Sequence, residues 1–277
     1  MSPKPDGASV RHLGILAGAG RLPKEVAEAR RSEGRSVFVV DLEGAAADWA
    51  ADFAHERVSL GQVGRVLALL EREGCDAVTM AGGLTRPSLT KVRFDRQGLA
   101  LVPRLVRLFR RGDDGLLSGV ADLFEEHGFP VIGADAFLPC SVAETGAIVG
   151  ELSEEGGVAL GRAILDALGP FDIGQAVVIA GGRCLAVEAA EGTALMLDRV
   201  AALRLEGETG GVLVKMPKRG QDARVDRPAI GPDTIRAAHR AGLSGIAVEA
   251  GGVFVLDAAR TEGLARETGL FLHGFEP

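Results

Sequence analysis

The chain has 277 residues, of which 47% are hydrophobic, enough for two domains of ordinary size with their own cores. A formal net charge of −7, one Trp and no Tyr argue against a protein that binds nucleic acid. There is no secretory signal and no apolar run near the roughly 20 residues of a membrane span, and the three cysteines are widely spaced, so we expect a cytoplasmic protein with reduced core cysteines.

The N-terminal half has the pattern of a parallel α/β domain. Short continuous apolar runs alternate with segments of helical spacing, as expected for strands that are buried on both faces of a parallel sheet. Ligands of such sheets bind at the carboxyl edge of the strands. The expected elements are strands over 13–16, 37–42, 77–81 and 130–133 and helices over 24–31, 63–73 and 119–126.

A glycine turn follows the first expected strand. Gly18 and Gly20 precede a helix and Asp41 ends the next strand, which resembles the start of a dinucleotide-binding fingerprint. The third glycine of that fingerprint is missing, and Pro23 stands in the first helical turn. Three interpretations stay open: a nicotinamide site, a site for another phosphate or nucleotide, and a plain tight turn.

The C-terminal half has a mixed pattern. A helical segment over 151–168 precedes a stretch rich in strands, and the paired glycines at 181–182 and 251–252 each predict a tight hairpin. We therefore expect an N-terminal Rossmann-like domain over 1–150 and a separate mixed α/β domain over 151–277. Its expected strands are 175–180, 184–189, 212–216, 245–249 and 253–256, and its later helices are 234–241 and 258–267.

The second half also concentrates polar residues that suit a phosphate. The segment 191–194 (Glu-Gly-Thr-Ala) is followed by Lys215 and by 221–226 (Gln-Asp-Ala-Arg-Val-Asp). Cations and backbone N–H groups neutralise phosphate charge, while carboxylates hold a metal ion or position water. A solvated polar loop explains the same spacing equally well. The five histidines are isolated from one another, which disfavours a metal site built on histidines.

Two further segments have competing interpretations. Asp113 and Asp114, between two glycines, suit either a magnesium or ribose contact or a helix N-cap. The segment 99–109 combines an apolar stripe with a basic face, which suits either a helix on an anionic lipid surface or a helix on its own domain, and Pro103 interrupts it. The basic face consists of Arg96, Arg104, Arg107, Arg110 and Arg111.

Several motifs, taken in order, resemble the UDP-2,3-diacylglucosamine pyrophosphatases of the LpxI family over nearly the whole chain. These motifs are 18–23 (Gly-Ala-Gly-Arg-Leu-Pro), 83–87 (Gly-Leu-Thr-Arg-Pro), 112–114 (Gly-Asp-Asp), 172–175 (Asp-Ile-Gly-Gln), 186–193 (Ala-Val-Glu-Ala-Ala-Glu-Gly-Thr) and 221–228. The resemblance implies a magnesium-dependent hydrolase of lipid A biosynthesis that cleaves UDP-2,3-diacylglucosamine to 2,3-diacylglucosamine 1-phosphate (lipid X) and UMP.

The resemblance also implies a set of site residues. Glu191, Asp222 and Asp226 are expected to hold Mg²⁺ or to orient water, with Glu191 and Asp222 as the metal ligands and position 194 beside them as catalytic. The expected substrate contacts are Gly18, Gly20, Leu22, Pro23, Gly83, Thr85, Arg86, Asp113, Asp114, Gln175, Thr193, Lys215, Gln221 and Arg224. Because the substrate is a lipid, the resemblance favours the lipid-facing interpretation of the arginine-rich segment and a peripheral position on the cytoplasmic face of the inner membrane.

One position departs from the family pattern. The family has an Asp after Glu-Gly-Thr, whereas this chain has Ala194. Since a methyl group neither binds a cation nor positions water, we hypothesise that the chain is a disabled variant that holds its ligand without turnover. A nicotinamide-dependent oxidoreductase and a non-catalytic carrier of a nucleotide lipid are the alternatives, and the oligomeric state is open.

Overall fold

The computed structural model describes residues 7–45, 47–83, 93–100, 112–138, 141–204 and 207–277. It divides the chain into two compact units, the first formed by 1–139 with 222–226 and the second by 140–221 with 227–277. The expected boundary lay at residue 150. The difference arises because 146–149 forms a strand of the second sheet, while 222–226 packs on the first unit.

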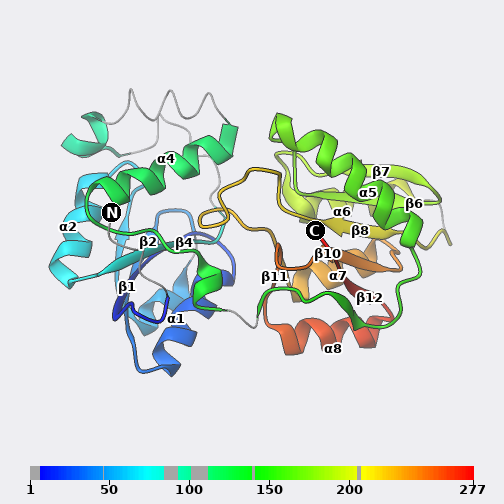
Figure 1. The fold of residues 1–277 in the computed structure, drawn as a ribbon, viewed down its shortest axis with the longest axis horizontal. Coiled ribbons are helices and arrows are strands. Elements are labelled where there is room, and N and C mark those ends of the chain that lie inside the picture. Colours follow the sequence, from blue (N-terminus) through cyan, green and yellow to red (C-terminus); the bar gives the residue numbers. More distant parts are fainter. Residues whose placement is uncertain (1–6, 46, 84–92, 101–111, 139–140, 205–206) are drawn as a thin grey trace. The chain divides into compact units, whose positions relative to one another are not determined.

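The first unit contains a four-stranded parallel sheet in the order β3-β2-β1-β4. Helix α1 packs on one face, and α2 and α4 cover the other (Figure 1). This confirms the expected Rossmann-like sheet. Its elements are β1 (His12–Ala17), α1 (Leu22–Ser32), β2 (Ser36–Leu42), β3 (Ala54–Val58), α2 (Val63–Glu73), β4 (Ala77–Ala81) and α4 (Gly112–Glu126).

Two local differences from the expected elements have simple causes. Strand β3 was not expected, because three of its five residues are polar and it lies at the edge of the sheet, where side chains face water. The expected strand over 130–133 is reduced to a single bridge between Val131 and Val78. For β3, the edge position weakens the hydrophobic pattern from which strands are predicted.

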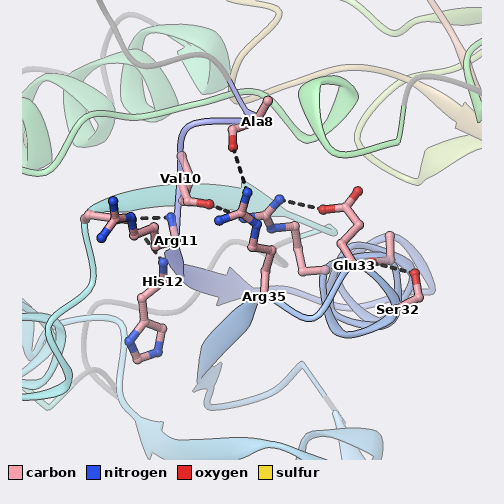
Figure 2. Close-up of polar contacts among 10 residues, drawn as sticks. Ala8, Val10, Arg11, His12, Ser32, Glu33 and Arg35 are labelled. Atoms are coloured by element: carbon pink, nitrogen blue, oxygen red, sulfur yellow. Dashed lines mark hydrogen bonds and ion pairs between the residues drawn. The ribbon is translucent and has the colours of Figure 1, made fainter.

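The segment before β1 is held by arginines from and beyond α1. Arg30, which is 2% exposed, donates hydrogen bonds to the Val10 carbonyl and to Glu33. Arg35 donates to the carbonyl of Ala8 (Figure 2). Two backbone N–H groups at the amino end of β1 donate to the carboxylate of Asp76. The amino edge of the sheet is therefore closed by polar contacts within the chain.

The second unit contains a six-stranded mixed sheet in the order β5-β12-β10-β8-β6-β7. Helix α5 covers one face, and α6, α7 and α8 cover the other (Figure 1). Its elements are β5 (Gly146–Val149), α5 (Glu155–Leu168), β6 (Ala176–Ala180), β7 (Arg183–Val187), α6 (Gly192–Leu203), β8 (Val212–Lys215), β9 (Ala229–Ile230), α7 (Pro232–Arg240), β10 (Gly245–Glu249), β11 (Phe254–Val255), α8 (Ala258–Thr268) and β12 (Phe271–Phe275).

One of the two expected hairpins is present. Strands β6 and β7 pair antiparallel around Gly181 and Gly182, whose positive φ angles of 56° and 71° suit a tight hairpin turn. The second expected hairpin is wrong, because β11 pairs with β9 in parallel and not with β10. Helix α6 was also missed, since the motif at its start was interpreted as part of a loop.

The cysteines differ in their surroundings. Cys75 is buried, and burial, helped by Glu73 and Asp76, raises the pKa of its thiol to about 12. Cys184 is exposed, which corrects the expectation that it is a core residue; it lies at the start of the edge strand β7, where Arg183 and Cys184 are both exposed. Cys140 lies outside the described ranges. In the described part of the chain no helix is long and apolar enough to cross a membrane.

Candidate functional site

The candidate site of the second unit lies where β8 ends and α6 begins. All four residues of β8 are buried, and Lys215, the last of them, is 7% exposed. Its Nζ atom donates a hydrogen bond of 2.7 Å to Oγ1 of Thr193, which in turn donates one of 2.7 Å to Oε1 of Glu188. An ammonium group only donates and a carboxylate only accepts, so the threonine proton must point towards Glu188.

Glu188 is held from several sides. It follows β7, its backbone N–H donates to the carbonyl of Ala176, and its Oε2 accepts a hydrogen bond of 3.1 Å from the backbone N–H of Gln175. The backbone of Gly174 approaches so closely that a Cβ there would lie 2.1 Å from the Glu188 carbonyl oxygen. A glycine is therefore required at 174, and the carboxylate of Glu188 has a defined orientation.

An amide network extends this cluster. Nε2 of Gln175 donates to Oε1 of Gln221 at 3.0 Å, and the same oxygen accepts the backbone N–H of Lys218 at 3.0 Å. The ammonium group of Lys218 pairs with Asp172. The loop after β8 is thus tied to the loop before β6, which brings the predicted residues Gln175, Thr193, Lys215 and Gln221 into one connected network.

The first turn of α6 completes the site. No side chain caps this end of the helix, so its backbone N–H groups carry the partial positive charge of a helix N-terminus. Gly192 has a φ of +79°, and Ala194 is exposed in the turn. A buried cation, a hydroxyl and a helix N-terminus together suit an anion such as a phosphate.

Glu191 has a different environment. Its carboxylate pairs with Arg199 of α6, and its pKa lies below the ordinary value because its own backbone N–H and then the Arg199 side chain stabilise the charged form. Within the second unit Glu191 is therefore engaged by a cation on the helix surface.

Asp222, Arg224 and Asp226 belong to the first unit. The Asp222 carboxylate accepts hydrogen bonds from the Arg224 guanidinium, which also donates to Glu125 of α4 at 2.6 Å. These carboxylates, Asp222 before Glu125, raise the pKa of Arg224. The N–H of Asp226 donates to the carbonyl of Asp222, so the two aspartates lie one helical turn apart.

The glycines of the first unit are explained by a close backbone crossing. The backbone N–H of Gly18, after β1, donates to the carbonyl of Ala81 at the end of β4, and Ala19 and Gly83 exchange two backbone hydrogen bonds. A Cβ at Gly18 would lie 2.7 Å from the Gly83 carbonyl oxygen, and one at Gly82 would lie 2.5 Å from that of Ala19. Glycine is needed here to let two loops touch, whatever binds nearby.

The remaining predicted residues are placed as follows. Leu22 and Pro23 begin α1, Gly20 precedes them with a φ of +97°, and Asp113 and Asp114 lie in the first turn of α4. Thr85 and Arg86 lie outside the described ranges. Of the arginine-rich segment, residues 96–100 are helical and 101–111 lie outside the described ranges, so the lipid-facing interpretation stays a prediction.

Sequence reasoning gave no role to three residues that the network uses: Asp172, Glu188 and Lys218. Glu188 had a detectable signal, because it is the first charged residue after an apolar strand and precedes the Glu-Gly-Thr motif. Among the described residues there is no group of three or more His, Cys, Asp or Glu side chains arranged to hold a metal ion.

Comparison with known proteins identifies the family. The model of the LpxI N-terminal domain matches residues 12–141, and the model of the LpxI C-terminal domain matches residues 145–273. The UDP-2,3-diacylglucosamine pyrophosphatase LpxI of Caulobacter vibrioides is 39% identical over 277 residues, covering 97% of this chain and 99% of that protein. The chain belongs to the LpxI family.

Proposed function

We propose that the chain carries the pyrophosphatase reaction of its family, in which water cleaves the diphosphate of UDP-2,3-diacylglucosamine to give UMP and 2,3-diacylglucosamine 1-phosphate. The observation that supports this most directly is the contact between the buried Lys215 and Thr193 at the uncapped N-terminus of α6, in a chain 39% identical to a pyrophosphatase along its length. The reaction would place the chain in lipid A biosynthesis.

The proposed role of the site follows from its charges. The transition state of phosphate-anhydride cleavage gathers negative charge on the phosphate oxygens, and preorganised donors lower its free energy. Lys215 and the first-turn N–H groups of α6 supply such donors. Glu188 already accepts from Thr193 and from Gln175, so we assign it the role of orienting Thr193.

Magnesium is part of the proposal. Mg²⁺ is commonly held by one or two carboxylates together with substrate phosphates and water, which is compatible with the lack of a three-ligand cluster among the described residues. Asp222 and Asp226, one turn apart in the first unit, are the carboxylates we assign to it. The ion would neutralise phosphate charge.

Ala194 bears on the rate. It is exposed in the first turn of α6, directly after Thr193, so a carboxylate at this position would stand at the phosphate end of the helix. We propose that the chain turns over slowly for want of this group, and that Ala194→Asp raises the rate.

The acyl chains of the substrate require apolar surface. Phe171, Leu195 and Leu203 of the second unit are 72%, 59% and 60% exposed. Such exposed apolar side chains are available to contact acyl chains. We propose that the chain collects its substrate at the cytoplasmic face of the inner membrane.

The test is release of UMP from UDP-2,3-diacylglucosamine, measured by chromatography with Mg²⁺ and with EDTA. The natural chain, Ala194→Asp and Lys215→Met are compared. We expect Mg²⁺-dependent UMP from Ala194→Asp, less from the natural chain and least from Lys215→Met. If neither the natural chain nor Ala194→Asp releases UMP, the proposed function is wrong; if both release it equally fast, the role given to Ala194 is wrong.

A further inference from the structure

The first unit contains a buried carboxylate that the site described above does not use. Asp41 is the last but one residue of β2 and is 2% exposed. It lies beside Ala17, the last residue of β1, at the carboxyl edge of the parallel sheet. Asp41 alternates with Val40 and Leu42, which belong to the core under α2 and α4, and so lies on the face that α1 covers.

The two oxygens of Asp41 are unequally satisfied. Oδ2 accepts a hydrogen bond of 2.6 Å from Nε of Arg57, whereas the buried Oδ1 has no hydrogen-bond partner among the described residues. A buried acceptor without a partner costs about 1–3 kcal/mol, and more when the group is charged. A valine, like its neighbours on β2, would avoid that cost, so packing alone does not explain an aspartate here.

The position of Asp41 points to a ligand. In the sheet order β3-β2-β1-β4, the strand that follows β1 in the chain lies on one side of β1, and β4 lies on its other side. The strand order therefore reverses direction at β1, and the loop after β1 lies at this switch point. Ligands of parallel sheets bind at such points. The loop leads into α1, which begins without a side-chain cap, and an acid at the end of the second strand is the acceptor that such sheets offer to ribose hydroxyls.

We propose that Asp41 binds the ribose of a nucleoside diphosphate by accepting hydrogen bonds from its vicinal hydroxyl groups. Two O–H donors would satisfy Oδ1 and replace Arg57 at Oδ2. Arg57 is 61% exposed, and Asp48 and Glu43 lie near enough to raise its pKa along with Asp41, the largest cause. The guanidinium therefore has other carboxylates near it when the ribose takes its place.

This inference rests on the proposed function, because a UDP-sugar substrate supplies the ribose, and it makes a separate prediction. A site that binds the 2′- and 3′-hydroxyl groups of the ribose must bind UDP more tightly than 2′,3′-dideoxyuridine 5′-diphosphate, which lacks both. Loss of hydrogen bonds to a charged acceptor weakens binding by roughly 10-fold or more. The nicotinamide interpretation of the same acid is tested alongside, with NAD as a third probe.

The experiment is calorimetric titration of the full chain with UDP, with the dideoxy analogue and with NAD. We expect the natural chain to bind UDP at least about 10-fold more tightly than the analogue, and Asp41→Asn to bind both equally weakly. Asp76→Asn is the matched control, since it removes the same charge at the opposite, amino edge of the sheet. It should keep the preference of the natural chain, and thermal unfolding should show all three proteins folded.

Three results would overturn the ribose site: equal affinity of the natural chain for UDP and its analogue, a preference that survives in Asp41→Asn, or no binding of UDP. A chain that releases UMP from the lipid substrate yet fails this titration keeps the proposed function and loses the ribose site. Tighter binding of NAD than of UDP would assign Asp41 to a dinucleotide instead.

Discussion

Nζ of Lys215 lies 2.7 Å from Oγ1 of Thr193, so the last residue of β8 and the first turn of α6 are joined by a hydrogen bond between side chains 22 positions apart. Lys215 is buried, and its charge is directed at the helix end where an anion is most stable. Because this hydrogen bond joins the two side chains, replacing each of them in turn tests the proposed site.

Lys215→Met should abolish most of the activity. The substitution keeps the length of the side chain and removes its charge, and loss of one preorganised donor typically lowers kcat about 10²–10³-fold. The substitution is made in the natural chain or in Ala194→Asp, whichever releases UMP faster, and the measurement is the steady-state rate of UMP release. Arg266→Met, on the exposed surface of α8, is the control and should leave the rate unchanged. A Lys215→Met enzyme of full activity would refute the assignment.

Thr193→Ser and Thr193→Val should separate the hydroxyl from the methyl group. Ser keeps the hydroxyl between Lys215 and Glu188, so we expect a rate within about threefold of the parent. Val keeps the shape of the side chain but leaves Oε1 of Glu188 without its hydrogen-bond donor. This loss should lower the free energy of unfolding by about 1–3 kcal/mol and remove most of the rate. Thermal unfolding and UMP release are measured on both. Equal rates for Ser and Val would show that the hydroxyl has no part in the reaction.

Glu249→Gln should stabilise the protein at neutral pH. Glu249 ends β10, is 6% exposed and has an Oε2 without a hydrogen-bond partner among the described residues. Burial raises its pKa, Arg219 and Arg162 partly offset this, and Asp166 adds to it. Between the ordinary and the raised pKa the folded state therefore binds more protons than the unfolded state, and the free energy of unfolding falls as pH rises through that window.

The stabilisation by Glu249→Gln should be on the order of 1 kcal/mol at pH 7 and vanish below the ordinary glutamate pKa. Urea unfolding at pH 7 and at pH 4 measures it. Arg219→Gln should act in the opposite direction, because it removes the cation that most favours ionised Glu249. If Glu249→Gln changes the free energy of unfolding by the same amount at both pH values, the explanation is wrong.

Gly82→Ala should destabilise the first unit more than Gly34→Ala. Both glycines have positive φ angles, 89° and 70°, so an alanine is strained at either position. At Gly34 the new Cβ has no neighbour within 4 Å, whereas at Gly82 it would lie 2.5 Å from the Ala19 carbonyl oxygen. We expect roughly 1 kcal/mol for Gly34→Ala and at least about 2 kcal/mol for Gly82→Ala, measured by urea unfolding. Equal losses of unfolding free energy in the two variants would show that the loops at Gly82 and Ala19 move apart to accept a Cβ without further cost.

Much of the fold follows from the sequence. The runs at 13–16, 37–42 and 77–81 are apolar apart from Asp41 and Thr79, because both faces of a central parallel strand are buried, and this pattern is hard to mistake. The short strands β9 and β11 have two residues each and no such pattern, so the sequence around Gly251 and Gly252 suggested a hairpin that does not form. Helix α6 was missed because the Glu-Gly-Thr motif at its start was interpreted as part of a polar loop.

The sequence alone determined the family, the α/β class, two sheet-forming halves and the chemical nature of the site residues, because apolar periodicity and motif order are local properties of the chain. The tertiary structure decided which of those residues meet. It joined Lys215 to Thr193 and Glu188, paired Glu191 with Arg199, and placed Asp222 and Asp226 with the first unit. Such pairings depend on strand order and loop contacts between residues far apart in the chain, which spacing along one sequence does not encode.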